Sequence, residues 1–263
     1  MEFDENKKET EKIEMSERES AEINREQGIE YIGERFQGID IKLSEKQKAQ
    51  FFDYYVLLTE KNKVMNLTAI TEFHEVVLKH FIDSCFCPEY IKEKKEGSLI
   101  DIGTGAGLPG IPLKIIYPEL HVTLLDSLNK RVLFLNEVIE KLNLRGIQTV
   151  HARAEDGAKN SKLREQFDFA VSRAVANLST LSEYCLPYVK VGGIFAAYKS
   201  GHAEDEVEQA KRAIFLLGGK AEKTEKGVLP ESDIERSIFL IRKKDHTSKK
   251  YPRKAGLPGK QPL

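Results

Sequence analysis

The sequence predicts an α/β fold in which a seven-stranded, mostly parallel sheet with an antiparallel last strand follows an N-terminal helical appendage. From residue 98 onward, short apolar runs alternate with longer segments of helical periodicity. This is the pattern of parallel strands joined by right-handed crossover helices. The last two apolar runs have no helix between them, so that pair is expected to be antiparallel. The predicted strands span residues 98–102, 121–126, 147–151, 167–172, 193–198, 220–226 and 237–242.

The part of the chain before this sheet is expected to be helical. Residues 1–16 are mostly charged and are predicted to form a disordered acidic extension. Residues 17–92 are predicted to form an N-terminal helical region, because apolar residues recur there at helical spacing. Ser44 and Gln47 make a capping box before its strongest helix, and Thr71 is expected to cap a later one.

The segment 98–117 is the centre of the predicted site. An apolar strand is followed by a glycine cluster, and a helix with Pro112 near its first turn comes next. Glycines let the backbone approach a ligand closely, and a helix N-terminus offers free N–H groups. Strand, glycine turn and helix in this order predict a cradle for a nucleotide or cofactor.

Two cofactor classes fit this glycine spacing. Residues 105–110 satisfy G-x-G-x-x-G, and Asp126 lies 21 residues after Gly105, where a dinucleotide fold places its ribose-binding acid. Asp101, two residues before Gly103, instead favours a cationic ligand that carries an ammonium and a sulfonium. We therefore favour S-adenosylmethionine, and an NAD-dependent oxidoreductase is the alternative. A glycine turn that binds no ligand is the third interpretation.

Side chains at the carboxyl ends of the predicted strands should converge on one crevice, because ligands of such sheets bind there. We expect Asp126 to accept both ribose hydroxyls and Leu108 to form an apolar wall. Ala154 and Glu155 are expected to frame the adenine, and Lys199 to contact RNA. The predicted cofactor-binding residues from these strand ends are Asp101, Gly103, Gly105, Gly107, Leu108, Asp126, Ser127, Leu128, Ala154 and Glu155.

The turn after the fourth strand restricts the reaction. Amino-group methylation usually uses an Asn/Asp-Pro-Pro-aromatic turn, whereas residues 172–175 read SRAV. Cys185 is expected within a helix, which argues against a cysteine nucleophile for cytosine carbon methylation. A guanine N7 needs no general base, so we expect no catalytic residue beyond positioning groups, Arg173 among them. If Arg173 touches the base, we expect a contact to O6 alone, because a bidentate contact would block N7.

A second polar group precedes the sheet. His80, Asp83 and Ser84 are spaced to lie on one helix face. They form either a polar lip over the cofactor or a satisfied helix end, and Asn66, His80 and Asp83 are the candidate pocket rim. No second His or Cys stands at ligand spacing to His80, so no metal is expected.

Composition and charge narrow the class of protein. Three cysteines without a C-x-x-C pair indicate a reducing cytoplasm. The acidic N-terminus lacks the apolar core of a signal peptide, and no apolar run approaches the roughly 18 residues of a membrane span. We expect a cytoplasmic monomer that contacts no membrane.

The net charge of −1 conceals two charged ends, because residues 1–40 carry −7 and residues 242–263 carry +7. The basic tail, residues 245–263, is either a solubilising disordered end or an arm that orders on RNA by contacting phosphates. If the tail neutralises about five phosphates, log K should fall with log[salt] at a slope of about −3.5 to −4.5. The tail residues predicted to bind RNA are Lys249, Lys250, Arg253, Lys254 and Lys260.

Several motifs together resemble the bacterial small-subunit ribosomal RNA guanine-N7 methyltransferases, also called the glucose-inhibited division protein B family. The likeness covers roughly residues 40–263. It is carried by NLTAI at 66–70, HFIDS at 80–84, the 101–112 loop, RAE at 153–155, SRAVA at 172–176, and RKAG at 253–256 with Pro258 and Lys260.

This resemblance implies a class I (Rossmann-like) methyltransferase domain over residues 98–244, with S-adenosylmethionine as donor. It implies a guanine in the 530 loop of 16S ribosomal RNA, guanine 527, as acceptor, in free RNA or in the small ribosomal subunit. It also implies cofactor contacts from Gly103, Leu108, Ala154, Glu155 and Arg173. Asp126 departs from the pattern, since many such enzymes have glutamate there. Methylation of another RNA position or a small molecule, and a non-catalytic RNA-binding module, are the alternatives.

Overall fold

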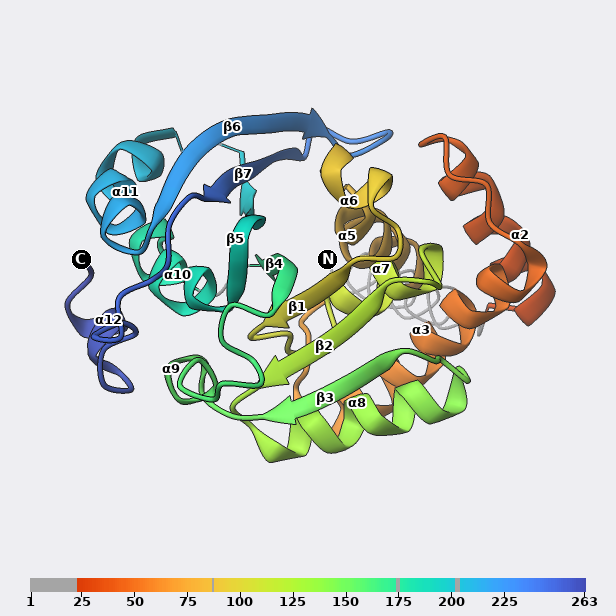
Figure 1. Ribbon diagram of the computed structural model, residues 1–263. Helices are drawn as coiled ribbons and strands as arrows, with labels where there is room; N and C mark the ends of the chain where they lie inside the picture. Colours follow the sequence, from red (N-terminus) through yellow and green to blue (C-terminus); the bar gives the residue numbers. More distant parts are fainter. Residues whose placement is uncertain (1–22, 87, 174–175, 202–203) are drawn as a thin grey trace, which may run out of the picture.

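The computed structural model describes residues 23–86, 88–173, 176–201 and 204–263. At its centre is a seven-stranded sheet with the strand order β3-β2-β1-β4-β5-β7-β6 (Figure 1). All of the strands predicted from the sequence are present. They are β1 (Ser98–Ile102), β2 (His121–Asp126), β3 (Ile147–His151), β4 (Phe167–Arg173), β5 (Val189–Ser200), β6 (Gly219–Val228) and β7 (Glu235–Lys243).

The strand pairing confirms the predicted fold class. From β3 across to β5 neighbouring strands run parallel, whereas β7 runs antiparallel to both β5 and β6. β5 begins earlier than predicted because Val189 already pairs with Phe167 of β4. The order of the parallel strands reverses between β1 and β4. In such sheets a ligand crevice forms at this switch point, outside the carboxyl ends of the strands.

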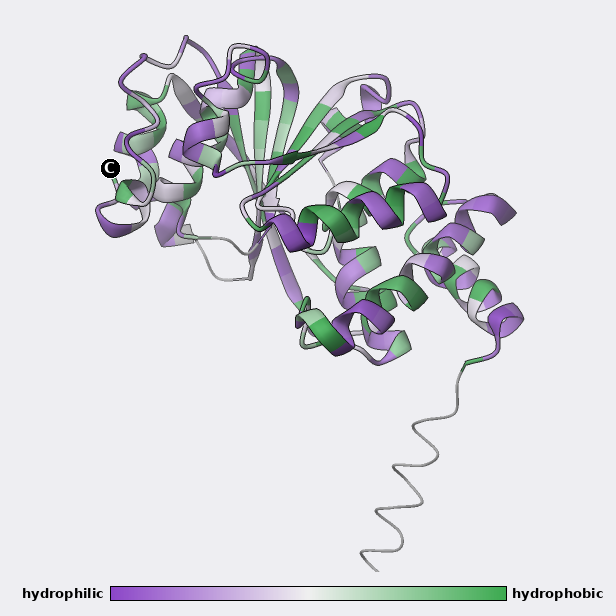
Figure 2. Ribbon diagram, turned by 90° about the horizontal axis from the view of Figure 1, so that it is seen from below, coloured by the Kyte–Doolittle hydropathy of each residue, from purple (hydrophilic) through white to green (hydrophobic). Residues whose placement is uncertain are grey.

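Helices cover both faces of the sheet and enclose two apolar cores. Side chains of each strand alternate between the cores, so that Leu99 lies in one and Ile100 in the other. In Figure 2 the apolar strands lie between helices that carry hydrophilic residues on their outer surfaces. The helices after β1 are α7 (Gly110–Ile116), α8 (Asn129–Lys141), α9 (Ala154–Gly157), α10 (Leu178–Cys185), the 3₁₀ turn η2 (Leu186–Tyr188), α11 (Glu204–Leu216) and α12 (Leu257–Lys260).

The described part of the N-terminal region is helical, as predicted. The Ser44–Gln47 capping box is present before the long helix α3. Thr71 is not a cap, which corrects the expectation: the Glu72 carboxylate accepts bonds from the N–H groups of His74 (2.9 Å) and Glu75 (2.7 Å). Two carboxylate oxygens satisfy two N–H groups, and a negative charge is favoured at a helix N-terminus. The elements are α2 (Arg25–Gln37), α3 (Glu45–Met65), α4 (Phe73–Val76), the π-helix η1 (Val77–Ile82), α5 (Asp83–Cys85) and α6 (Glu89–Glu93).

These helices share the core of the sheet instead of forming a separate unit. Phe51 of α3 and Phe81 of η1 are fully buried in the same apolar core as Leu124 of β2. Tyr54 on α3 is also fully buried, and its hydroxyl donates to the carbonyl of Ala106 at 2.6 Å. The N-terminal region therefore supports the glycine loop directly.

The acidic extension expected at residues 1–16 lies outside the described residues, as do Ala174 and Val175 of the turn after β4. Within the residues that the structure does describe, there is no helix with the length and apolar character needed to cross a membrane.

Candidate active site

The loop between β1 and α7 is built from glycines with positive φ angles. Gly103, Gly105 and Gly107 have φ values of 71°, 61° and 101°, a region that residues with a Cβ rarely adopt. A Cβ on Gly107 would lie 2.4 Å from Ile111 Cδ1, so this glycine is needed for packing. A Cβ on Gly105 would meet nothing closer than 4.0 Å. The space at Gly105 is therefore open to a ligand.

Asp101 on β1 is a buried acid beneath this loop. Its Oδ2 accepts hydrogen bonds from Thr104 Oγ1 at 2.7 Å and from Gly110 N at 2.9 Å. Its Oδ1 has no hydrogen-bond partner, although the side chain is fully buried. Burial raises the pKa of Asp101 to about 6, in spite of these two hydrogen bonds. An orphaned buried oxygen is unfavourable, so this atom fits a cationic ligand such as the sequence predicts.

Asp126 at the end of β2 holds the glycine loop from the other side. Its Oδ2 accepts from Gly105 N and its Oδ1 from Leu128 N, both at 2.9 Å. Arg131 Nη1 lies 3.4 Å from Oδ2. Ser127 and Leu128 form the turn that follows, and Leu128 is 42% exposed. The structure thus brings Asp126 to the loop, and its contact with a ribose stays a prediction.

Ala154 and Glu155 begin α9, beyond the carboxyl end of β3. Tyr188 donates its hydroxyl to the Ala154 carbonyl at 2.6 Å. Glu155 is buried, and its Oε1 accepts from Gly256 N of the C-terminal tail at 2.7 Å. The Glu155 carboxylate is therefore engaged by the chain itself, and adenine contacts at this position stay a prediction.

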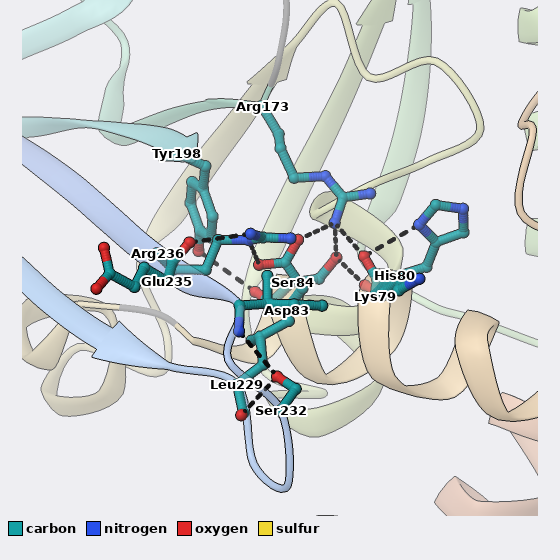
Figure 3. Close-up of polar contacts among 11 residues, drawn as sticks. Lys79, His80, Asp83, Ser84, Arg173, Tyr198, Leu229, Ser232, Glu235 and Arg236 are labelled. Atoms are coloured by element: carbon teal, nitrogen blue, oxygen red, sulfur yellow. Dashed lines mark hydrogen bonds and ion pairs between the residues drawn. The ribbon is translucent and has the colours of Figure 1, made fainter. Parts of the chain in front are cut away.

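Arg173, the last residue of β4, belongs to a buried ionic cluster (Figure 3). Arg173 Nη1 donates to Asp83 Oδ2 at 3.1 Å, and Arg236 Nε donates to Asp83 Oδ1 at 2.7 Å. Asp83 is only 4% exposed. One buried carboxylate thus orients two guanidinium groups, from the end of β4 and the start of β7.

His80 lies on η1 next to this cluster. Its Nε2 is 2.7 Å from Thr68 Oγ1. Burial, followed by the nearby positive charge of Arg173, lowers the pKa of His80 to about 4, so the imidazole is neutral at pH 7. Asn66 is the left-handed C-cap of α3, with φ 49°. Of the three expected rim residues, His80 and Asp83 are among the residues that line the cleft described next, and Asn66 is not in that set.

A cleft of about 410 Å³ opens at the cluster. The β1–β4 register aligns Asp101 with Val171, so Arg173 ends the strand next to the one that leads into the glycine loop. The positive charge of Arg173 is near enough to Asp101 to act on its carboxyl group, lowering its pKa against the larger effect of burial. On its rim, Lys199 Nζ lies 2.8 Å from Glu206 Oε2. Four cationic side chains and two carboxylates are among the lining residues, which are Lys79, His80, Asp83, Arg173, Tyr198, Lys199, Ser200, Glu206 and Arg236.

The C-terminal tail packs against the domain, whereas the sequence predicted either a disordered end or an arm that orders on RNA. Arg253 donates from Nη2 to Glu183 Oε2 on α10 at 2.7 Å. Arg164 donates to the carbonyls of Thr247 and Tyr251. The tail is ordered because the domain offers it buried partners, and Arg253 is already paired with a carboxylate. The tail lysines that remain exposed are Lys249, Lys250, Lys254 and Lys260.

Sequence reasoning missed several residues of this site. Tyr54 looks like one more aromatic in the apolar stripe of α3, and Lys79 and Arg236 look like solvated charges. For Glu183 the sequence does contain a usable signal of a buried acid, because Glu183 is the one charged residue of the segment 178–188. Among the described residues, no group of three or more His, Cys, Asp or Glu side chains is arranged to hold a metal ion.

Comparison with known proteins shows the family to which the chain belongs. A family model described as GidB, rRNA small subunit methyltransferase G, matches residues 47–235. Ribosomal RNA small subunit methyltransferase G of Staphylococcus carnosus is 51% identical over 237 residues, which cover 90% of this chain and 99% of that protein. The protein of the same name from Acetivibrio thermocellus is 54% identical over 226 residues, or 86% of this chain and 93% of that one. The chain therefore belongs to the rRNA small subunit methyltransferase G family and is an S-adenosylmethionine-dependent methyltransferase.

Proposed function

We propose that this protein methylates N7 of a guanine in 16S ribosomal RNA, with guanine 527 of the 530 loop as the acceptor. The observation that carries the proposal is the cleft at Arg173. It opens at the carboxyl end of β4, the strand that pairs with β1 before the glycine loop, and is lined by Lys79, Arg173, Lys199 and Arg236. A cationic cleft beside a cofactor cradle is suited to a polyanionic acceptor such as RNA.

The residues around the glycine loop fit S-adenosylmethionine, which supplies an electrophilic methyl group on a sulfonium sulfur when bound. Asp101 would meet the cationic part of the cofactor with the orphaned Oδ1. The open face of Gly105 leaves room for the ligand, and Asp126 would receive the ribose hydroxyls. Leu108 and Ala154 would meet the adenine from either side.

The acceptor chemistry matches the groups that line the cleft. Guanine N7 carries its own lone pair, so no group has to remove a proton before it attacks. The one histidine of the cleft, His80, is neutral at pH 7, because its pKa is lowered to about 4. The protein then contributes positioning and in-line approach, worth up to roughly 7–11 kcal/mol in favourable cases.

Arg173 acts as a positioning group in this proposal. Asp83 and Ser84 hold its Nη1 on one side of the cleft. A bidentate contact to O6 and N7 is the commonest arginine–guanine contact, but it would occupy the lone pair that must react. Arg173 therefore contacts O6 alone or the carboxylate of the cofactor.

Cations of the cleft and of the C-terminal tail together hold the RNA substrate. Lys199 lies at the cleft rim, and the exposed lysines of the tail extend the basic surface. Phosphate contacts fix register and orientation without reading sequence. We propose that the enzyme works in the cytoplasm as a monomer, on free 16S RNA or on the small ribosomal subunit.

The test is methylation of 16S RNA that lacks N7-methylguanine, supplied as free RNA and as assembled small subunits. Borohydride and aniline treatment cuts RNA at N7-methylguanine, and primer extension then maps the cut. We expect a new cut at guanine 527 with S-adenosylmethionine and none with NAD. A cut elsewhere would move the acceptor position, and methyl transfer to a small molecule alone would overturn the proposal.

A matched pair of variants tests whether the cleft at Arg173 takes part in methylation. Arg173→Lys keeps the charge but loses the planar guanidinium, so we expect at least a tenfold fall in kcat/KM. Arg212→Lys makes the same change on an exposed helical residue of α11, and we expect no effect. Equal kcat/KM values for the two variants would show that Arg173 and its cleft take no part in the reaction.

A further inference from the structure

Two buried carboxylates outside the cleft hold the C-terminal tail. Glu183 on α10 is fully buried, and it receives Arg253 N at 2.7 Å, Arg253 Nε at 3.0 Å and Arg253 Nη2 at 2.7 Å. Glu155 on α9 is 4% exposed and receives Gly256 N at 2.7 Å. Both carboxylates thus accept hydrogen bonds from the tail. Because a buried charge without a partner is strongly unfavourable, these bonds favour the packed position of the tail.

The two anchors lie on helices that follow the carboxyl ends of two strands, β3 and β4. Glu155 follows β3, at the helix expected to frame the adenine. Glu183 lies on α10, which follows β4 and Arg173. Beyond Gly256 the tail makes a further contact with α10, where Thr180 Oγ1 donates to the carbonyl of Pro258 at 3.1 Å. Figure 1 shows the result, with α12 and the end of the chain lying beside α10.

The anchored tail presents its lysines outward. Arg253 turns inward to Glu183, whereas Lys249, Lys250, Lys254 and Lys260 are exposed. Among the described tail residues these lysines flank both anchor points, at Arg253 and Gly256. Bidentate arginine–carboxylate pairs fix geometry as well as charge. The lysines are therefore carried on a segment whose position is already set before RNA arrives.

We propose that Glu183 and Glu155 are positioning residues that fix residues 249–260 as a preformed phosphate-binding rim and tie this rim to the adenine side of the cofactor site. The inference rests on the proposed function, because RNA is the partner whose phosphates the rim receives. A rim that is already in place loses less conformational entropy on binding than a free arm. Because Glu155 joins the rim to α9, RNA binding and cofactor binding are coupled, and the coupling is reciprocal.

The test separates positioning from charge. Glu183→Gln keeps the shape and lets the amide accept one hydrogen bond, but it loses the charged pair with Arg253. We expect RNA to bind about tenfold more weakly, with an unchanged slope of log K against log[salt], because the lysines are all still present. We expect KM for RNA to rise while kcat at saturating RNA is retained. The double variant Lys254→Ala/Lys260→Ala leaves the anchor intact but removes two cations. It should therefore make the slope of log K against log[salt] shallower by about 1.4–1.8.

Two further measurements report on the position of the rim without an RNA methylation assay. Trypsin should cut Glu183→Gln at tail lysines at least tenfold faster than the parent, and the S-adenosylmethionine Kd should rise several-fold through Glu155. Asp156→Asn is the control on the same helix as Glu155, because Asp156 is exposed and pairs with Lys159 at the surface. It should change none of these values. If Glu183→Gln does not fold, the double variant Glu183→Gln/Arg253→Gln replaces the ion pair by an amide pair.

The outcomes are distinguishable. Unchanged proteolysis, cofactor affinity and RNA affinity in a folded Glu183 variant would overturn the inference. A shallower salt slope in Glu183→Gln would also overturn it, since that result makes the anchor a charge effect on RNA. If the parent enzyme left 16S RNA unmethylated, the proposed function would fail, while trypsin cutting and cofactor titration would still report on the anchored rim.

Discussion

Asp83 binds Arg173 across the edge of the cleft, with Arg173 Nη1 3.1 Å from Asp83 Oδ2. The same carboxylate binds Arg236 through its other oxygen at 2.7 Å. A residue of the N-terminal region therefore decides where two cations of the sheet are placed.

Replacing this carboxylate tests the cluster. Asp83→Asn keeps the shape but removes the negative charge that both guanidinium groups bind. We expect the free energy of unfolding to fall by roughly 1–3 kcal/mol and kcat/KM to fall at least tenfold. Urea unfolding and the RNA methylation assay measure the two effects. Asp53→Asn, at an exposed pair with Arg25, is the control and should change stability by less than about 1 kcal/mol.

The orphaned oxygen of Asp101 makes cofactor affinity depend on pH. Because the pKa of Asp101 is raised to about 6, the carboxyl gains its negative charge between about pH 5 and 7. A cationic ligand binds the charged form, so S-adenosylmethionine affinity should rise by up to about tenfold over this range. Calorimetric titration at several pH values measures it. Asp101→Asn should bind more weakly at pH 7 and show a flat profile, and a flat profile in the parent would contradict this role.

His80 should make the fold less stable in mild acid. Its pKa is lowered from 6.5 to about 4, so between these values the unfolded chain binds more protons than the folded one. The free energy of unfolding therefore decreases as the pH falls from 6.5 towards 4, by about 3 kcal/mol from this residue. Asp101 contributes the opposite slope below pH 6, because its folded pKa is raised. Comparing urea unfolding of His80→Gln with the parent isolates the histidine, and identical pH slopes would refute its contribution.

Two glycines of one loop should respond differently to the same change. Gly107→Ala places a Cβ 2.4 Å from Ile111 Cδ1, so we expect a loss of stability of roughly 2 kcal/mol or more. Gly105→Ala meets open space, and its φ of 61° costs about 1–2 kcal/mol. Its main effect should be weaker cofactor binding, because the methyl group occupies the cradle. Thermal unfolding and cofactor titration of both variants compare them, and equal cofactor affinity of Gly105→Ala and the parent would show that the cradle lies elsewhere.

The sequence predicted the sheet well because periodicity and glycine turns are local signals. The strands at 98–102, 121–126 and 147–151 appear with the predicted bounds. Asp101 and Asp126 were found because they stand at fixed distances from the glycines. Long-range pairs left no such trace. The contacts of Asp83 with Arg236, and of Glu183 with Arg253, join residues 153 and 70 positions apart.

The tail was misjudged for a related reason. Its composition, rich in lysine, glycine and proline, is typical of a flexible segment. The local sequence does not indicate that buried carboxylates elsewhere in the fold accept hydrogen bonds from it. Glu155 was assigned to the adenine because it follows a strand end. The same position also brings its carboxylate to the N–H of Gly256.

The hydrogen bond from Tyr54 to Ala106 means that the cofactor cradle is not a self-sufficient module. A fragment beginning at residue 98 would keep every glycine of the loop and lose the hydroxyl that holds its midpoint. It would also uncover the apolar surface that Phe51 and Phe81 now fill. During synthesis, the N-terminal helices leave the ribosome before the glycine loop that Tyr54 contacts. We therefore expect firm cofactor binding to require that both parts of the chain have folded together.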